Sequence, residues 1–223
     1  MIPPRLYLIA ARDVTAPKPL VRVVADTLRA FGALRLPPTT LALQLREKSL
    51  GTRDLMALAR DLRDLTGVAG VPFLINDRMD VALAVGADGV HLAGTSLALA
   101  DAAKVAATRT PGLALALSTH HPEELAEAAR LRAAVAPTLA FAVFGPVHET
   151  PSKRAFGPPQ GLARLGAAVA AAGDLPVLAL GGFDGDRTKR EAALATGAAG
   201  ISCMRAVLGS ETPEKILAAL LGV

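Results

Sequence analysis

The sequence predicts an α/β protein with one domain, residues 1–223, folded as a single (β/α)8 TIM barrel. Three observations predict this fold. Short apolar runs alternate with longer amphipathic segments, there are eight such runs, and 223 residues lie near the lower length limit of this barrel. The runs are almost continuously apolar, which is typical of parallel strands covered on both faces.

The expected strands follow one another along the whole chain, and each precedes a helix-like segment. They are Arg5–Ala10, Leu41–Arg46, Pro72–Asn76, Gly89–Leu92, Leu113–Ser118, Leu139–Gly145, Val177–Gly181 and Gly200–Met204. The helix expected after the second strand has the clearest 3.6-residue periodicity, through Leu55, Leu58, Leu62 and Leu65. We expect Thr52 to cap its N-terminus and Gly67 to end it.

A doubly wound open sheet is the competing architecture, and it usually has a glycine-rich turn after its first strand. Here that turn, residues 11–14, reads ARDV and contains no glycine. The Pro- and Gly-rich stretch Gly145–Gly161 is interpreted as a long loop after the sixth strand, because no change of composition marks a domain boundary. A single barrel is therefore expected.

Composition and charge exclude several classes of protein. With 52% hydrophobic and 20% charged residues, the chain is not intrinsically disordered. It is basic, at +4, but the basic residues are scattered and only six Phe and one Tyr are available, so no nucleic-acid partner is expected. No apolar run reaches the ~20 residues of a membrane span, and the N-terminal apolar patch is too short for a signal peptide. A cytoplasmic protein with no membrane partner is expected.

The active site of such a barrel lies at the carboxyl ends of the strands, and polar residues collect there. They follow the second strand (residues 44–48, QLREK), the third (76–78, NDR), the fifth (118–121, STHH), the sixth (145–153, GPVHETPSK) and the seventh (Gly181 and Gly182). Cys203, in contrast, lies inside the last strand and is interpreted as core packing. We therefore place the candidate site at the carboxyl ends of the strands.

The second strand brings two cations to this end of the barrel. Alternation places Gln44, Arg46 and Lys48 on one side and Glu47 on the other. Cations inside a closed barrel are costly without an anionic partner, so they indicate a bound anion. The alternative is that Arg46 and Lys48 pair with Glu47 or with other nearby acids.

Further groups suited to phosphate follow the sixth and seventh strands. Thr150, Ser152 and Lys153 supply hydroxyls and a cation, and the glycine pair at 181–182 lets backbone N–H groups approach a phosphate closely. Asp77 is a candidate Mg²⁺ ligand if the anion is a pyrophosphate. Its alternative role is the N-cap of a helix over Arg78–Val85.

Several motifs, in order and at family spacing, resemble the thiamine-phosphate synthase and thiazole tautomerase family. The matching stretches are residues 43–48, 74–78, 87–92, 117–120, 144–147 with 150–153, and 180–182. Such synthases join hydroxymethylpyrimidine pyrophosphate to a thiazole phosphate, giving thiamine phosphate and pyrophosphate. The resemblance implies that pyrophosphate departs first and that the thiazole nitrogen traps a pyrimidinyl-methyl cation.

The resemblance also implies roles for individual residues. Those expected to hold the pyrophosphate end of the pyrimidine substrate are Gln44, Arg46, Lys48, Asn76 and Lys153. Ser118 is expected near the departing group, Asp77 on Mg²⁺, and Thr150, Ser152 and Gly182 around the thiazole phosphate. Arg46, Ser118 and Lys153 are the expected catalytic residues.

Three positions depart from the family pattern. Ser96 stands where a second magnesium-binding Asp is expected, and a neutral hydroxyl is a weaker ligand for Mg²⁺. Arg205 follows the last strand where a small-residue phosphate turn is usual, and it could contact a phosphate or block the turn. Ser152 replaces the more usual Thr. Magnesium is therefore expected as a cofactor held through Asp77 alone.

These departures leave two alternatives to a synthase. A tautomerase needs no metal, and His148 is the candidate acid–base group because Pro146 occupies the position of the usual histidine. A non-catalytic relative would bind thiazole phosphate or thiamine phosphate without turnover. His91 is interpreted as structural, and His120 and His121 as capping or hydrogen-bonding residues. The expected partners are small phosphorylated substrates, and a homodimer is left open.

Overall fold

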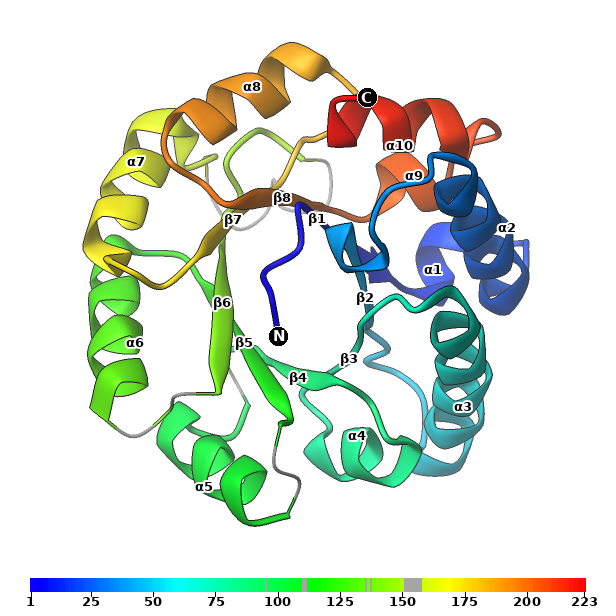
Figure 1. Cartoon of the computed structure of the whole chain (residues 1–223), viewed down its shortest axis with the longest axis horizontal. Helices are drawn as coiled ribbons and strands as arrows, with labels where there is room; N and C mark the ends of the chain where they lie inside the picture. Colours follow the sequence, from blue (N-terminus) through cyan, green and yellow to red (C-terminus); the bar gives the residue numbers. More distant parts are fainter. Residues whose placement is uncertain (95, 110–111, 135, 137, 151–157) are drawn as a thin grey trace.

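The computed structural model describes residues 1–223 except 95, 110–111, 135, 137 and 151–157. Its strands form a closed parallel barrel in the order β1 to β8, ringed by helices (Figure 1). The strands are β1 (Leu6–Ala10), β2 (Leu41–Leu45), β3 (Phe73–Asn76), β4 (Gly89–Leu92), β5 (Ala114–Thr119), β6 (Leu139–Phe144), β7 (Val177–Leu180) and β8 (Gly200–Cys203). The predicted (β/α)8 barrel is confirmed.

The helices lie outside the strands. They are α1 (Arg12–Thr15), α2 (Leu20–Ala33), α3 (Thr52–Ala69), α4 (Met79–Val85), α5 (Leu99–Arg109), α6 (Pro122–Ala134), α7 (Gly161–Ala172), α8 (Arg187–Ala195), α9 (Arg205–Leu208) and α10 (Pro213–Leu221), with a 3-10 turn at Pro38–Thr40. Among the described residues, no helix combines the length and the apolar character needed to cross a membrane.

The ends of α3 differ from the prediction. Gly51 is its N-cap and Thr52 its first residue, so Thr52 is not the cap. The helix continues past Gly67 and ends at Gly70, which has a φ of +66°. A left-handed residue stops a helix, and glycine adopts that conformation without steric cost. Gly67 has no such φ and remains helical.

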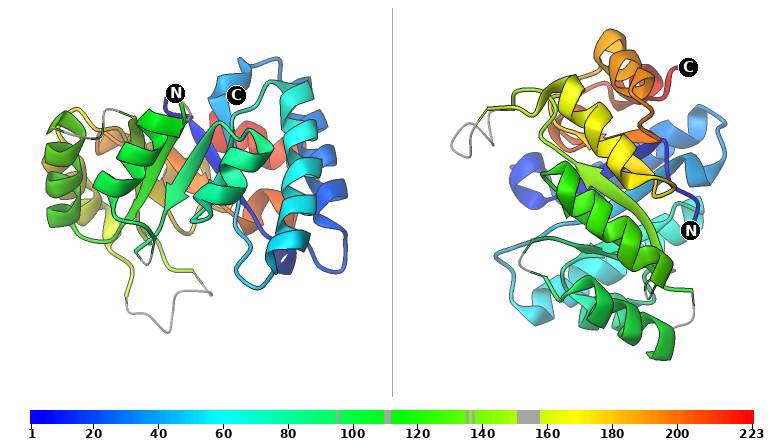
Figure 2. Two further views of the ribbon diagram at one scale, coloured as in Figure 1. Left: turned by 90° about the horizontal axis from the view of Figure 1, so that it is seen from below. Right: turned by 90° about the vertical axis from the view of Figure 1, so that its left-hand side faces the viewer.

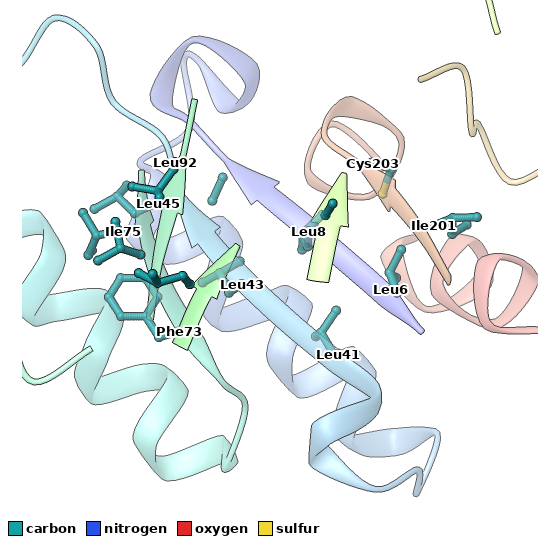
Figure 3. Packing of buried hydrophobic residues seen from close by; sticks show 14 of the residues in the cluster. Leu6, Leu8, Leu41, Leu43, Leu45, Phe73, Ile75, Leu92, Ile201 and Cys203 are labelled. Carbon is teal, nitrogen blue, oxygen red and sulfur yellow. The ribbon is translucent and has the colours of Figure 1, made fainter. Parts of the chain in front are cut away.

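Each strand divides its side chains between two apolar layers. Leu41, Leu43 and Leu45 of β2 pack in the layer between the strands and the helices (Figure 3). Ala42 belongs instead to the cluster inside the barrel. Because side chains alternate along a strand, Gln44 also points inward, as predicted.

An apolar plug fills the barrel below its mouth. Its buried members are Tyr7, Ala42, Leu74, Ala116, Phe141, Val143 and Leu178. The Tyr7 ring meets the Phe141 ring edge-on, with ring centroids 5.1 Å apart. Such a packed interior is usual for this fold, so polar chemistry is confined to the layer above the plug.

The barrel closes where β8 pairs with β1, from Leu6 with Ile201 to Leu8 with Cys203. Two arginines hold the end of α10 near the amino ends of the strands. Arg5 Nη2 donates to the Leu221 carbonyl at 2.5 Å, and Arg190 Nη2 donates to the same oxygen at 3.3 Å. Both chain termini lie at this end of the molecule (Figure 2).

Candidate active site

Three polar side chains at the ends of β2 and β3 form a hydrogen-bonded row at the mouth of the barrel. Gln44 Nε2 donates to Asn76 Oδ1 at 2.7 Å, and Asn76 Nδ2 donates to Asp77 Oδ2 at 2.7 Å. Gln44 and Asn76 are buried, and no described residue forms a hydrogen bond with Gln44 Oε1. The structure thus brings three predicted site residues together and leaves one buried acceptor open.

Asp77 is held in an unusual backbone conformation beside β4. Its φ is +61°, a left-handed value that Asp and Asn adopt more readily than most residues. Its Oδ1 accepts hydrogen bonds from the Ala93 backbone N–H, at 3.2 Å, and from the Ser96 hydroxyl. The N-cap of α4 is Arg78, with no side-chain capping bond, so the alternative role of Asp77 as the cap is wrong.

Glu47 does not neutralise Arg46 and Lys48, the two cations at the end of β2. The Glu47 carboxylate accepts the Arg12 backbone N–H at 2.5 Å and Arg12 Nε at 3.2 Å, and its side chain is 6% exposed. Within the described ranges, neither Arg46 nor Lys48 forms an ion pair with a carboxylate. The pairing alternative for Arg46 and Lys48 is therefore not observed.

Asp77 fits Mg²⁺ as a single protein carboxylate. The described part of the chain pairs no Lys or Arg with it, so its charge is uncompensated at the mouth. The described residues also contain no cluster of three His, Cys, Asp or Glu suited to a metal. Mg²⁺ commonly binds through one or two carboxylates together with substrate phosphate oxygens, so substrate would have to complete this site.

Ser118 projects from β5 beside a buried histidine. Its Oγ lies 2.7 Å from His91 Nε2, and the Tyr7 hydroxyl lies 3.3 Å from His91 Nδ1. Burial lowers the pKa of His91 to about 4, with Asp77 opposing and Arg46 adding to the shift. The ring is therefore neutral at pH 7. Sequence reasoning gave His91 a structural role and missed this contact, although alternation in β4 and β5 points both side chains inward.

The opposite side of the mouth is built from backbone and glycine. Gly182 has a φ of +74°, and a Cβ there would overlap His148 Cβ. Two polar atoms, His148 Nε2 and Thr150 Oγ1, are buried without hydrogen-bond partners among the described residues. Unpartnered buried polar groups are costly, which indicates that a polar ligand belongs here. Phosphate binding by Gly182 and Thr150 stays a prediction.

His148 packs against Phe183 edge-on, with ring centroids 5.3 Å apart. Burial lowers the pKa of His148, the charge of Lys189 lowers it further, and Asp184 and Asp186 act in the opposite direction. The imidazole is therefore neutral at pH 7 and retains an open ring nitrogen.

The remaining predicted residues have varied positions. Ser152 and Lys153 lie outside the described residues, so the structure places neither. Arg205 is exposed and begins α9 directly after β8. Cys203 is buried, which raises its pKa to about 12, and its interpretation as core packing is confirmed.

The two histidines after β5 make the expected hydrogen bonds. The backbone N–H groups of His120 and His121 donate to Glu124 Oε2, at 2.6 and 3.2 Å. His120 Nδ1 also lies 2.6 Å from the Gly145 carbonyl. Their interpretation as capping or hydrogen-bonding residues is confirmed.

A closed (β/α)8 barrel whose described charges of both signs lie without ion-pair partners at the carboxyl ends of the strands has the arrangement of a barrel enzyme. The thiamine monophosphate synthase family model matches residues 6–207. The chain belongs to this family. The family includes transferases that release pyrophosphate, so the resemblance seen in the sequence is confirmed.

Individual relatives agree with this assignment. A thiamine-phosphate synthase from Roseiflexus castenholzii is 37% identical over 98% of this chain and 87% of its own length. One from Deinococcus radiodurans is 39% identical over 92% of this chain and 68% of its own length. The solved thiamine phosphate pyrophosphorylase of Pyrococcus furiosus is 30% identical, with a TM-score of 0.77 over 97% of this chain and 93% of its own. Together they support thiamine-phosphate synthase, a transferase, as the activity of this chain.

More distant structures share only the fold. A 3-hexulose-6-phosphate synthase is 18% identical and has a TM-score of 0.66 over 98% of each chain. At that identity, the likeness carries the barrel architecture and nothing about the substrate.

Proposed function

We propose that this chain condenses hydroxymethylpyrimidine pyrophosphate with thiazole phosphate by a dissociative route, using the two sides of the mouth for the two substrates. The carbon–oxygen bond to pyrophosphate breaks first, and its electron pair leaves with pyrophosphate. The thiazole nitrogen then donates its lone pair to the pyrimidinyl-methyl cation, forming the new carbon–nitrogen bond. One observation carries the proposal: Asp77 lacks a cation partner and Arg46 and Lys48 lack carboxylate partners in the described structure.

Charges that do not neutralise one another remain available to a substrate. Arg46 and Lys48 would stabilise the negative charge that develops on the departing pyrophosphate. When bound at Asp77, Mg²⁺ would neutralise part of the same charge. Lys153 is proposed to contact pyrophosphate on the resemblance alone.

Gln44 and Asn76 are proposed to position the pyrimidine ring next to this charge. Gln44 Nε2 uses one of its two hydrogens on Asn76, and its open Oε1 is an acceptor. A phosphate oxygen offers no proton, whereas the amino group of the pyrimidine does. The hydrogen-bond pattern therefore favours an amino-group contact over the pyrophosphate contact that the resemblance implies for Gln44.

Thr150, Ser152 and Gly182 are proposed to hold the thiazole phosphate. Within the part of the chain that the structure describes, the buried Thr150 hydroxyl has no partner, and Gly182 leaves the room that a Cβ would fill. A phosphate oxygen would accept the Thr150 hydroxyl hydrogen, removing the cost of the unpartnered group.

The proposal is tested with Asp77→Asn, which keeps the left-handed backbone and the size of the side chain. We expect kcat for thiamine phosphate formation to fall roughly 100-fold, as when one preorganised electrostatic group is lost, and the Mg²⁺ concentration needed for half-maximal rate to rise. Product and pyrophosphate are measured with Mg²⁺ and with chelator. The control is Asp80→Asn, which changes a nearby exposed carboxylate on α4. We expect it to keep wild-type kinetics.

An Asp77→Asn enzyme with unchanged kcat and unchanged magnesium dependence would contradict the proposed metal position. Wild-type protein that binds thiazole phosphate but forms no product would instead indicate a non-catalytic relative.

A thiazole tautomerase is the second candidate, because His148 offers a neutral imidazole with an open, buried Nε2. A neutral imidazole can take a proton and return it, as an isomerisation requires. Metal-independent isomerisation of a thiazole carboxylate phosphate that is lost in His148→Asn would favour this candidate. Retention of synthase activity in His148→Asn would favour the synthase.

A further inference from the structure

A row of three hydrogen-bonding side chains crosses the barrel interior to the mouth. Tyr7 on β1, His91 on β4 and Ser118 on β5 are joined by the Tyr7 hydroxyl–His91 Nδ1 contact of 3.3 Å and the His91 Nε2–Ser118 Oγ contact of 2.7 Å. Tyr7 is 0% exposed and His91 3% exposed. Ser118, at the upper end of the row, is only half-buried and reaches the mouth.

The direction of these hydrogen bonds follows from the Tyr7 hydroxyl. Burial raises the pKa of Tyr7 well above its ordinary value, so the phenol keeps its proton. In the described structure that hydroxyl contacts His91 Nδ1 and no other polar partner. A buried O–H group needs an acceptor, and therefore Tyr7 donates to Nδ1.

The proton on the histidine ring is then fixed as well. A ring nitrogen that accepts a hydrogen bond carries no proton, so a ring whose Nδ1 accepts from Tyr7 is neutral and has a single proton. Since Nδ1 accepts from Tyr7, the proton sits on Nε2 and is donated to Ser118 Oγ. The Ser118 hydroxyl hydrogen is not used by His91 and is free to point elsewhere.

We infer that Tyr7 and His91 are positioning residues that hold the Ser118 hydroxyl as a hydrogen-bond donor toward the departing pyrophosphate. This inference rests on the proposed function, in which Ser118 lies next to that group. In the opposite tautomer, with the proton on Nδ1, Ser118 would donate to Nε2 and present only lone pairs to an anion. The ring tautomer thus decides whether Ser118 attracts or repels pyrophosphate.

A purely structural role for Tyr7 would depend on its ring and not on its hydroxyl. The Tyr7 ring stacks on His91, with centroids 5.6 Å apart, and meets Phe141 edge-on. Tyr7→Phe keeps both ring contacts and removes only the hydroxyl. It therefore separates packing from control of the tautomer.

The test combines ¹⁵N NMR of the His91 ring with steady-state kinetics. In the wild type we expect the proton on Nε2, and in Tyr7→Phe a shift toward the Nδ1-protonated form. We expect kcat to fall about tenfold in Tyr7→Phe, because one hydrogen bond to a charged group is lost. KM for the pyrimidine substrate should be unchanged. In a Ser118→Ala background, Tyr7→Phe should have no further effect on kcat.

Phe141→Leu is the control for packing, because it removes the edge-on ring contact with Tyr7 and leaves the hydroxyl in place. It should lower stability without changing the His91 tautomer. A wild-type ring protonated on Nδ1, or a Tyr7→Phe enzyme with unchanged kcat, would overturn the inference. An inactive wild type would count against the proposed function alone, since NMR reads the tautomer without turnover.

Discussion

Two sides of the barrel mouth hold their polar groups by different means. On the amide side, Gln44, Asn76, Asp77 and Ser96 are bonded to one another from strand to strand, and among their described atoms only Gln44 Oε1 is buried without a partner. On the glycine side, formed by His148, Thr150 and Gly182, polar atoms are buried without partners and the space is set by backbone. The amide side is therefore organised before substrate arrives, whereas the glycine side is completed by its ligand.

The two sides therefore contribute differently to the stability of the folded chain and to the free energy of ligand binding. Side chains that satisfy one another fix their own geometry and stabilise the folded chain. Unpartnered hydroxyl and imidazole groups cost folding free energy until a ligand supplies the missing hydrogen bond. Changes on the amide side should alter the fold and the chemistry, and changes on the glycine side should alter ligand binding first.

The largest expected effect is a loss of stability at acidic pH. It is caused by His91, which lies beneath the amide side. Its folded pKa is about 4, against an ordinary value near 6.5, so the unfolded chain binds the proton more tightly. Stability is thus full above pH 6.5 and falls as the pH drops to 4, by about 3 kcal/mol at ~1.4 kcal/mol per unit. Urea unfolding of wild type and His91→Gln at pH 7, 5 and 4 measures this loss, which the variant should lack.

His148 on the glycine side offers the comparison for this experiment. Its pKa is lowered in the same direction, but the residue is only half-buried. His148→Gln should therefore remove less of the acid sensitivity than His91→Gln. Equal effects of the two substitutions would contradict the contrast between the two sides.

The next effect concerns the shape of the glycine side. Gly182→Ala places a Cβ against His148 and forces an unfavourable positive φ, so the β6 and β7 loops must move apart. A displacement of about 1 Å in a binding site can reduce activity roughly 100-fold, and we expect a loss of that order. Gly67→Ala, in the open last turns of α3, is the control and should keep activity. Full activity of Gly182→Ala would show that the close approach is not needed.

The smallest of the three effects tests a single unpartnered hydroxyl. Thr150→Val should raise KM for thiazole phosphate about tenfold, through loss of one hydrogen bond to a charged group, and leave KM for the pyrimidine substrate unchanged. Thr138→Val is a matched control, because Thr138 Oγ1 is also buried without a partner but precedes β6 at the other end of the barrel. Equal KM changes for both substrates would place Thr150 outside the thiazole phosphate pocket.

Much of the fold was predictable from sequence because buried parallel strands leave a direct signal. Every expected strand agrees with the structure to within one residue at each end. Alternation also predicts correctly that Gln44 faces the interior, and it separates Glu47 from Arg46. The end of α3 was not predicted, because Gly67 and Gly70 look alike until the backbone shows which has a positive φ.

The partners of the site residues were harder to predict, because they depend on contacts between distant strands. Glu47 bonds to Arg12, 35 positions earlier, which requires the register that pairs Ala10 with Leu45. His91 lies against Tyr7, 84 positions earlier, across the inside of the barrel. Neither distance can be inferred from local pattern, since both are set by how the ring of strands closes.

The closure between β8 and β1 has a consequence for local opening of the barrel. All other neighbouring strands in the ring follow one another along the chain, whereas β8 and β1 come from opposite ends of the sequence. Three residue pairs join them, together with the hydrogen bond from the Ser202 hydroxyl to the Tyr7 carbonyl. Local opening there converts the ring into an open sheet with two free edges while leaving every other strand pair intact. Amide hydrogen exchange across this junction therefore reports how often the ring is open.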